Sequence, residues 1–380
     1  MSKILLLDTN FSSAPIFQCL SQLGHEVYVV GDNPDDYLAR VSGSYCRVNY
    51  SDYDALSRFV DVGCYDYILP GCNDLSYKMC ARLGLSSVDG LAATETINNK
   101  RSFRAFAREI NVPSPQAYFE GQIPTGKQLI VKPVDAFSGR GVAVVNSGSC
   151  SDLQRAISRA CAVSAAGECV IEDYIEGQLY SHSCFIDDGN VVLDFFVEEH
   201  GTANPFVVDT SRVTWDMELK IVSQFRECIQ KIARELNLVD GLVHTQFVVR
   251  DGEFWLIEIT RRCPGDLYSQ LIELSTGFDY AYCYARYFLK DRLGLPCAVD
   301  KKNWILRHTM SLSSTGDLGF FSFHFPLKIE RFVPLKSAGS QVKESPYGRM
   351  AILFVRADDA FELDEIFQRT LRRELYSVGV

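Results

Sequence analysis

Apolar runs and helically spaced apolar positions alternate over the first 95 residues. An apolar run at residues 3–7 is followed by apolar residues at helical spacing from Ile16 to Leu23, and a second apolar run covers residues 27–30. A third run at 65–71 again leads into a helical stretch. Strands that alternate with helices predict a small parallel sheet with helices on its faces.

After residue 95 the strands lie closer together and glycine-containing turns separate them. The elements expected there are helices at 98–112, 152–163 and 216–237, two strands around a loop at 129–145, a strand at 169–172, strands on either side of a turn at 187–190, a hairpin around Asp251-Gly252, strands within 306–312 and 349–355, and a terminal helix near 361–371. With 380 residues the chain is long enough for two or three domains. We expect an α/β and α+β multidomain protein, with a βα domain at 1–95, a central domain at 96–295, and a small α+β unit at 296–380.

The balance of charges excludes some classes of function. The chain has 38 lysines and arginines against 48 aspartates and glutamates, which gives a net charge of −10, and it has no run of five basic residues. A nucleic-acid partner needs a basic surface and is therefore not expected. No apolar stretch reaches the ~18 residues of a membrane span, and the N-terminus lacks a secretory signal pattern. We therefore expect neither a nucleic acid nor a membrane as a partner.

The thirteen cysteines form no C-x-x-C pair, and most lie within apolar patterns. This spacing fits neither a zinc site nor a disulfide framework, and free cysteines are typical of reducing compartments. We therefore expect a cytoplasmic protein.

Lys132 is the first candidate for chemistry, because it lies inside the apolar strand LIVKP. A buried ammonium group is costly unless an anion neutralises it. The loop DAFSGRG at 135–141 follows, and its two glycines, its hydroxyl and Arg140 suit a loop that lays backbone N–H groups over phosphates. Such loops are common, so an ordinary surface loop is the alternative.

The segment VIEDYIEG at 170–177 is a strand that ends in acidic residues and then becomes a linker. Backbone groups exposed at such a point can hydrogen-bond an adenine edge while aliphatic side chains pack on its face. Taken alone, the segment is better explained as an ordinary edge strand.

The hairpin at 243–266 is the most informative stretch. Its second strand, FWLIEIT, places Glu258 in an apolar run ahead of Arg261 and Arg262. A carboxylate at such a position needs a cation, and Mg²⁺ with nucleotide phosphate oxygens is the usual partner. An ion pair between Glu258 and Arg262 is the alternative.

The length of the turn decides whether this hairpin can hold a metal. A three-residue loop at 251–253 would pair Gln246 with Glu258 on one face, whereas a two-residue loop would place them on opposite faces. The metal-site interpretation needs the first, bulged arrangement.

Taken in order, these segments resemble the ATP-grasp superfamily, specifically its carboxylate–amine ligases related to purine-biosynthetic and biotin-carboxylase-type enzymes. The resemblance covers nearly the whole chain: residues 1–95, with ILPGCNDL, resemble the pre-ATP-grasp domain, N-N-K-R at 98–101 resembles the site of the first nucleotide lysine, and H-T-Q followed by E-I-T-R-R resembles the family's His-Thr-Glu and Glu-x-Asn-x-Arg patterns. It implies the ATP-grasp fold, with a lid at about 115–185 in the central domain at 96–295, and with ATP and Mg²⁺ as cofactors. The residues that it assigns to the nucleotide are Lys100, Lys132, Ser138, Gly139, Arg140, Gly141, Glu172, Asp173, Tyr174 and Ile175. It assigns catalysis to Arg262 and Glu258, the metal to Glu258, Gln246 and Thr260, and the wall of the acceptor pocket to residues 198–212.

Three positions depart from the family pattern. Gln246 stands where the family has a metal carboxylate, Thr260 where it has a metal-binding asparagine, and Leu179 where a ribose-binding glutamate is common. An amide oxygen supplies only a dipole to a hard cation, so we expect one tightly held metal rather than two.

The resemblance implies a ligase that uses ATP to activate a carboxylic acid as an acyl phosphate and couples it to an amine, releasing ADP and phosphate. A small-molecule acid and amine, amino acids among them, are the expected partners. A homodimer is expected only because the resemblance implies it. The alternatives are an ATP-binding protein with weakened turnover, a kinase on the same fold, and a bicarbonate-using carboxylase. The loop at 135–141 has fewer glycines than the carboxylases' loop, which disfavours the last of these.

Overall fold

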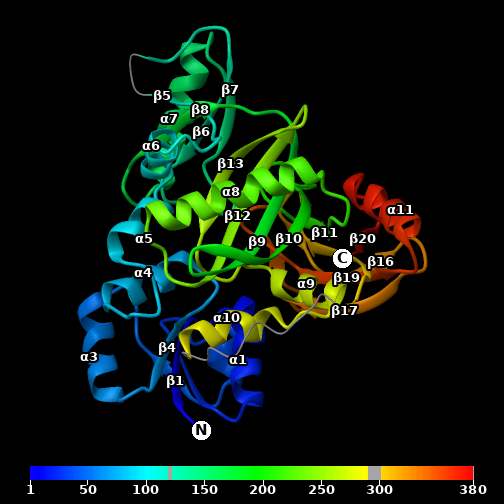
Figure 1. Ribbon diagram of the computed structural model, residues 1–380. Coiled ribbons are helices and arrows are strands. Elements are labelled where there is room, and N and C mark those ends of the chain that lie inside the picture. Colours follow the sequence, from blue (N-terminus) through cyan, green and yellow to red (C-terminus); the bar gives the residue numbers. More distant parts are fainter. Residues whose placement is uncertain (119–121, 290–300, 380) are drawn as a thin grey trace.

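The computed structural model describes residues 1–118, 122–289 and 301–379 (Figure 1). The blue N-terminal part lies at one end, the lid formed by β5 to β8 lies at the other, and a large sheet lies between them. Among the described helices, none combines the length and the apolar character needed to cross a bilayer.

The N-terminal part is a small parallel sheet with helices, as the sequence pattern predicts. Its strand order is β3-β2-β1-β4, and β1 pairs in parallel with both β2 and β4. Residues 4–7 of β1 are all buried, which is typical of a parallel strand covered on both faces. The elements are β1 (Lys3–Leu7), a 3-10 turn (Phe11–Ser13), α1 (Ala14–Gln22), β2 (Glu26–Gly31), α2 (Tyr37–Val41), β3 (Tyr45–Arg47), α3 (Tyr53–Gly63), β4 (Tyr67–Pro70), α4 (Asp74–Arg82) and α5 (Leu91–Asn98).

The lid is a four-stranded antiparallel sheet with the order β5-β8-β6-β7 and one helix packed on it. The long helix α6 (Lys100–Glu109) leads into the lid, which contains β5 (Ala117–Tyr118), β6 (Gln128–Pro133), β7 (Ala143–Asn146), α7 (Cys150–Val163) and β8 (Cys169–Asp173). The expected helix at 98–112 is thus shorter, because Asn99 caps it by accepting a hydrogen bond from the backbone N–H of Ser102.

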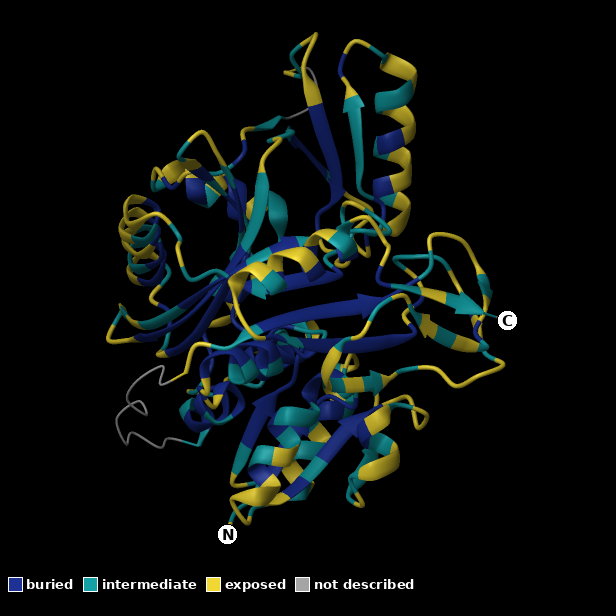
Figure 2. Ribbon diagram, turned by 90° about the vertical axis from the view of Figure 1, so that its right-hand side faces the viewer, coloured by how far each residue is buried: buried dark blue, intermediate teal, exposed yellow. Residues whose placement is uncertain are grey.

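An eight-stranded sheet with the order β13-β12-β9-β10-β11-β14-β19-β17 forms the body of the molecule. Its pairs are antiparallel, and its strands are buried over much of their length (Figure 2). The elements are β9 (Gln178–Asp187), β10 (Asn190–His200), β11 (Thr210–Val213), α8 (Leu219–Glu235), β12 (Gly241–Arg250), β13 (Glu253–Thr260), α9 (Tyr268–Thr276), α10 (Tyr280–Phe288), β14 (Trp304–Met310), β17 (Lys328–Pro334) and β19 (Ala351–Ala357).

Helices cover both faces of this sheet. Cys184 and Ile186 of β9 pack in the same apolar cluster as Phe225 of α8, whereas Phe185, between them, packs with Tyr280 of α10. Because neighbouring residues of a strand point to opposite faces, α8 covers one face and α9 with α10 covers the other.

The C-terminal strands β14, β17 and β19 extend the same sheet as β9 to β13. The remaining elements are β15 (Gly316–Asp317), β16 (Phe320–Phe323), β18 (Gln341–Val342), α11 (Ala360–Leu371) and β20 (Tyr376–Gly379). The domain boundary expected at 295/296 lies outside the described residues, and strands on both sides of it share one sheet.

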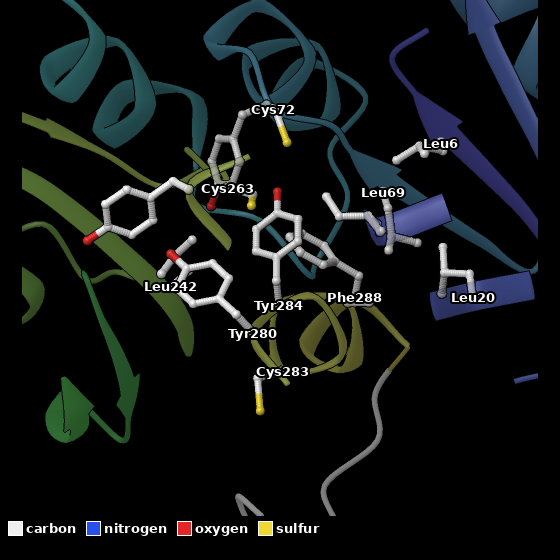
Figure 3. Close-up of a cluster of buried hydrophobic side chains, with 14 of the residues drawn as sticks. Leu6, Leu20, Leu69, Cys72, Leu242, Cys263, Tyr280, Cys283, Tyr284 and Phe288 are labelled. Atoms are coloured by element: carbon white, nitrogen blue, oxygen red, sulfur yellow. The ribbon is translucent and has the colours of Figure 1, made fainter. Parts of the chain in front are cut away.

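A buried cluster joins the N-terminal part to the body. Figure 3 shows Tyr284 and Phe288 of α10 lying beside Leu69 of β4, and the Tyr284 hydroxyl donates to the Pro70 carbonyl at 3.2 Å. A buried ion pair adds to this contact, since Arg261 at the end of β13 binds Asp89 at 2.7 Å. The N-terminal sheet is therefore held against the face that α9 and α10 cover.

The hairpin of β12 and β13 differs from the expected three-residue loop. Arg250 pairs with Glu253, so the turn has only the two residues Asp251 and Gly252, both at positive φ. The register shifts inside β13, where Ile257 is an extra residue between the pairs Phe247–Leu256 and Gln246–Glu258. Gln246 and Glu258 are thus partners on one face, as the metal-site interpretation requires, but a bulge in the strand rather than the loop sets this register.

Candidate active site

The residues that the sequence singles out lie on five segments that meet between the lid and the body. They come from the first turn of α6, from β6 and β8 of the lid, from the loop between β6 and β7, and from the β12–β13 hairpin. Lys100 connects three of these segments, because its backbone N–H donates to the Val134 carbonyl and its ammonium group donates to the Ala136 carbonyl at 2.9 Å. The same ammonium group lies 3.0 Å from the Glu258 carboxylate. The alternative pair of Glu258 with Arg262 is not formed.

Lys132 is buried, as expected, and its anion in this structure is Glu172. The Lys132 ammonium lies 2.8 Å from one oxygen of this fully buried carboxylate, and Arg104 lies 2.8 Å from the other. Burial raises the pKa of Glu172, but the charges of Arg104 and Lys132 outweigh it and hold the pKa below its ordinary value. Burial also lowers the pKa of Lys132, an effect that Glu172 partly offsets. Two cations share one carboxylate, so the cluster carries one surplus positive charge that suits an anion.

The loop at 138–141 has the features of a phosphate cradle. Ser138, Gly139 and Gly141 all have positive φ, which turns successive backbone N–H groups in unusual directions. Within the described ranges, no group accepts a hydrogen bond from the four backbone N–H groups of 138–141. The Nε of Arg140 is buried without a hydrogen-bond partner, and its guanidinium stacks over Phe137. Among the described residues, the loop therefore offers backbone donors and a positive charge that have no hydrogen-bond or ion-pair partner in the protein.

The linker after β8 has fewer free donors than expected. The backbone N–H of Asp173 donates to the Gln116 carbonyl and that of Tyr174 to the Gln128 carbonyl. The Asp173 carboxylate binds the Tyr118 hydroxyl at 2.9 Å and Lys127 at 3.3 Å. Of the three linker N–H groups at 173–175, that of Ile175 alone has no partner among the described residues, which makes it the best candidate for an adenine contact.

The three expected metal ligands each have a protein partner. Glu258 binds Lys100, the amide nitrogen of Gln246 donates to Glu199 at 2.8 Å, and the Thr260 hydroxyl donates to Asp74 at 2.7 Å. The Gln246 amide nitrogen is thus turned toward Glu199, and its oxygen stays available. In the described part of the chain, no group of three or more histidine, cysteine, aspartate or glutamate side chains is arranged so that it could hold a metal ion. A single Mg²⁺ bound by Glu258 fits these donors, because Mg²⁺ commonly takes one or two carboxylates and completes its shell with phosphate oxygens and water.

Arg262 lies beside this group and is held by Asp74. Its Nε lies 3.0 Å from the Asp74 carboxylate, which also receives the Thr260 hydroxyl. Neither side chain is fully buried, since Arg262 is 18% exposed and Asp74 34%. Arg262 thus stays open to a ligand, whereas the adjacent Arg261 is enclosed.

Sequence reasoning missed Arg104 and Asp74, and it included Glu199 only as part of the range 198–212. Arg104 binds Glu172 and also donates to the Ile257 carbonyl at 2.6 Å, so it ties the lid to the bulge that sets the hairpin register. Its one local signal is its position four residues after Lys100, on the same face of α6. Asp74 and Glu199 reach the site only through long-range packing, and burial raises the pKa of Glu199.

Part of the chain matches known proteins in sequence. Residues 125–270 match the family model described as an ATP-grasp domain. The carbamoyl phosphate synthase large chain of Saccharolobus solfataricus is 27% identical over 190 residues, which cover 49% of this chain and 16% of that protein. The chain thus spans less than a fifth of the length of such relatives.

Solved structures match over the whole chain. The L-amino acid ligase from Bacillus licheniformis superposes with a TM-score of 0.78 at 16% identity, covering 100% of this chain and 99% of that one. The biotin carboxylase domain of the Hydrogenobacter thermophilus 2-oxoglutarate carboxylase, solved with MgADP and bicarbonate, gives 0.76 at 15% identity and covers 100% and 91%. At these identities the likeness concerns the fold, which is that of ATP-grasp enzymes.

Proposed function

We propose that the protein is an ATP-dependent ligase that joins a carboxylic acid to an amine, because residues 125–270 match the ATP-grasp domain model and the chain has the fold of ATP-grasp enzymes. The observation that carries the proposal is the surplus of positive charge and free N–H donors beside Glu258. Lys132 with Arg104, the loop at 138–141 and Arg140 together suit a triphosphate.

In this proposal ATP lies between the lid and the body. The adenine lies at the linker after β8, near Glu172 and the free N–H of Ile175. The phosphates lie between Lys132, Lys100 and the loop at 138–141. When ATP is bound, the Lys100 ammonium group contacts the phosphates and loses part of its contact with Glu258. The Glu258 carboxylate is then free to bind a cation.

The first step forms an acyl phosphate. A carboxylate oxygen of the acid attacks the γ-phosphorus, the bond to the β-γ bridging oxygen breaks, and ADP leaves with the electron pair. Arg262, fixed by Asp74, offsets the charge that develops on the transferring group. Glu258, with Gln246 and Thr260 as further oxygen donors, would hold Mg²⁺, and the ion would offset the charge of the phosphates.

The second step forms the C–N bond. The amine nitrogen attacks the acyl carbon, the bond to the phosphate oxygen breaks, and phosphate leaves. A protonated amine loses two protons in all, one to the leaving phosphate and one to solvent. The loop at 138–141 contacts the loop after β10, since a side chain at Gly139 would meet the Phe206 carbonyl, and this contact limits the access of water to the acyl phosphate.

The test is ADP release in a matrix of small carboxylic acids and amines, each supplied singly and in pairs. The proposal expects ADP in proportion to product and only when both partners are present. Hydroxylamine serves as a general amine, because it converts an acyl phosphate into a hydroxamate, which forms a coloured complex with added iron(III). ADP formation that needs an acid but no amine, with a stable phosphorylated product, would indicate a kinase instead.

A second candidate is an ATP-binding protein with weakened turnover. Gln246 and Thr260 favour it, because neither supplies the charge of a carboxylate to a metal. If this candidate is correct, ATP binds and protects the protein from unfolding. No acid in the matrix then yields ADP or hydroxamate.

A further inference from the structure

A pocket of about 180 Å³ lies on the side of the eight-stranded sheet where α11 (red in Figure 1) packs, and we call it the α11 pocket. His308 and Ser311, at the end of β14 and just beyond it, line the pocket from the sheet. Arg373 and Leu375 line it from the segment that follows α11. Thr202, in the loop after β10, forms a third side.

The sheet separates the α11 pocket from the candidate metal ligands. Ile305 and Leu306 of β14 point to opposite faces, because the first packs in the cluster of α9 and α10 and the second in that of α11. His308 lies on the same face as Leu306. Gln246 lies on the face of α9, since its register partner Ser181 donates to a tyrosine hydroxyl of that helix. The α11 pocket is thus distinct from the site beside Gln246.

One wall of the pocket offers hydrogen-bond donors. The Arg373 guanidinium donates to the Ser311 carbonyl at 3.0 Å and to the Thr202 hydroxyl at 3.4 Å. Both partners are neutral, and in the described part of the chain no carboxylate lies within 4.0 Å of this guanidinium. An arginine has five N–H donors, so the two bonds leave the others available to a ligand.

A buried carboxylate nearby, Asp209, does not take these donors. Its two oxygens accept four hydrogen bonds from the loop before it and from the start of β11, namely from the N–H groups of Thr202 and Ala203 and from the hydroxyls of Thr202 and Thr210. Burial lowers the pKa of His308 to about 4, the charge of Asp209 opposes this shift, and the charges of Arg373 and Arg307 add to it. Asp209 therefore attracts Arg373 only from a distance, and the guanidinium keeps its available N–H groups.

Two features of this wall are unfavourable for the fold by itself. Ser311 is 4% exposed, and its hydroxyl is buried without a hydrogen-bond partner among the described residues. Arg373 has a φ of 59° just after the end of α11, where glycine is usual because a side chain is strained there. Both features are explained if these two side chains bind a ligand.

The rest of the lining is apolar, and the volume limits the size of the ligand. Leu312, Leu375, Val378 and the ring of Tyr376 form this part. A dry cavity of about 150 Å³ holds benzene, so a pocket of about 180 Å³ accommodates a body of that size. Drug-sized ligands need roughly 300 Å³ or more, which excludes a nucleotide. Inorganic phosphate would leave the apolar part uncovered.

We propose that the α11 pocket binds a small organic carboxylate, whose oxygens accept hydrogen bonds from Arg373 and Ser311 while its apolar body contacts Leu375 and Val378. The ligand is neither the acid nor the amine of the proposed ligase, because the sheet lies between the α11 pocket and Gln246. The inference therefore stands or fails independently of the proposed function.

The experiment is calorimetry on the whole protein with benzoate, cyclohexanecarboxylate and hexanoate. Each carboxylate is compared with its neutral amide, which keeps the apolar body, and with acetate, which keeps the charge. We expect at least one of the three to bind once per protein, tenfold or more tightly than its amide and than acetate, both with and without saturating ADP. If the amides or acetate bind as tightly as the carboxylates, or if ADP displaces them, the proposal is wrong. Phosphate that binds as tightly and displaces them would also contradict it.

Variants locate the binding. Arg373→Gly should weaken it tenfold or more while the unfolding midpoint stays nearly unchanged, because a charged hydrogen bond is lost but glycine suits the positive φ. Ser311→Ala should weaken binding less and leave the midpoint unchanged, since its hydroxyl has no partner to lose. Arg372→Ala is the matched control, because this exposed neighbour binds Glu374, and its loss should leave the affinity unchanged.

Two results with these variants would overturn the proposal. If Arg372→Ala weakens binding as much as Arg373→Gly, the carboxylate is attracted only by the charge at the end of α11. If Arg373→Gly lowers the unfolding midpoint and leaves the affinity unchanged, Arg373 has a structural role alone. The comparison of ligands on the wild-type protein requires no variant.

Discussion

The adjacent arginines after β13 have different partners, and removing those partners should have unequal effects. Asp89 is fully buried and accepts hydrogen bonds from Arg261 at 2.7 Å, from the Tyr77 hydroxyl at 2.9 Å and from the Val239 N–H at 2.8 Å. Asp89→Ala would leave the buried Arg261 guanidinium without its counter-charge, although the Leu242 and Val239 carbonyls still accept from it, and would remove the acceptor of the Tyr77 hydroxyl and the Val239 N–H. We therefore predict that it lowers the free energy of unfolding by about 3–5 kcal/mol, the cost of breaking a buried ion pair on one side.

Asp74→Ala is the matched control. Its carboxylate is 34% exposed, and water can replace it at Arg262. A pair of this exposure contributes about 1 kcal/mol or less, so the loss of stability should be small while turnover falls. Asp89→Asn keeps one acceptor oxygen in place, so its loss of stability should lie between those of Asp89→Ala and Asp74→Ala.

Urea unfolding followed by tryptophan fluorescence measures the difference. With an m value of about 3 kcal/mol/M, Asp89→Ala should lower the midpoint by about 1 M or more, and Asp74→Ala by about 0.3 M or less. Equal shifts for the two variants would refute the division between an enclosed structural arginine and an open functional one.

Four further predictions concern the site and its surroundings. Lys132→Ala should weaken ATP binding by tenfold or more, because a charged hydrogen bond contributes about 1.5–3 kcal/mol, and calorimetry that finds unchanged affinity would defeat the assignment. Arg262→Ala should lower kcat far more than ATP affinity, and equal losses would make it a ground-state anchor. Gln246→Glu should place a second carboxylate beside Glu199 and so lower the free energy of unfolding when no metal is present, yet it should raise the affinity for Mg²⁺ in the presence of ATP. If Mg²⁺ titrations of the variant and the wild type superimpose, residue 246 is not a metal ligand. Burial lowers the pKa of His308 to about 4, so the neutral imidazole contributes fully to the free energy of unfolding above pH 6.5, and this stability is lost as the pH falls toward 4. His308→Gln should therefore remove about 3 kcal/mol of the loss of stability between pH 6.5 and 4. An unchanged slope of the urea midpoint against pH would contradict this prediction.

Most of the fold could be predicted because it follows local patterns. The alternation of strands and helices in the first 95 residues, the turn at Asp188-Gly189 and the turn at Asp251-Gly252 are all signalled by neighbouring residues. The bulge at Ile257 could not be predicted in this way. Its carbonyl accepts a hydrogen bond from Arg104, which lies in a distant part of the chain and is not signalled by the residues around Ile257.

The candidate site could be predicted in part for the same reason. Lys132 attracted attention because a lysine in an apolar strand is unusual, but nothing near it in sequence identifies Glu172, forty residues away, as its partner. Glu199 and Gln246 lie 47 residues apart, and only the strand order β12-β9-β10 brings them together. Sequence patterns indicate which residues are unusual, and the sheet order decides which of them meet.

The origin of the oxygen in the released phosphate tests the central claim most directly. ATP is consumed in ¹⁸O-labelled water with an acid and an amine that support turnover, and the phosphate is analysed by mass spectrometry. In the acyl-phosphate route the new phosphate oxygen comes from the acid, so the account predicts phosphate without ¹⁸O. One ¹⁸O per phosphate would mean that water attacks the γ-phosphorus, and that the protein hydrolyses ATP without forming an acyl phosphate.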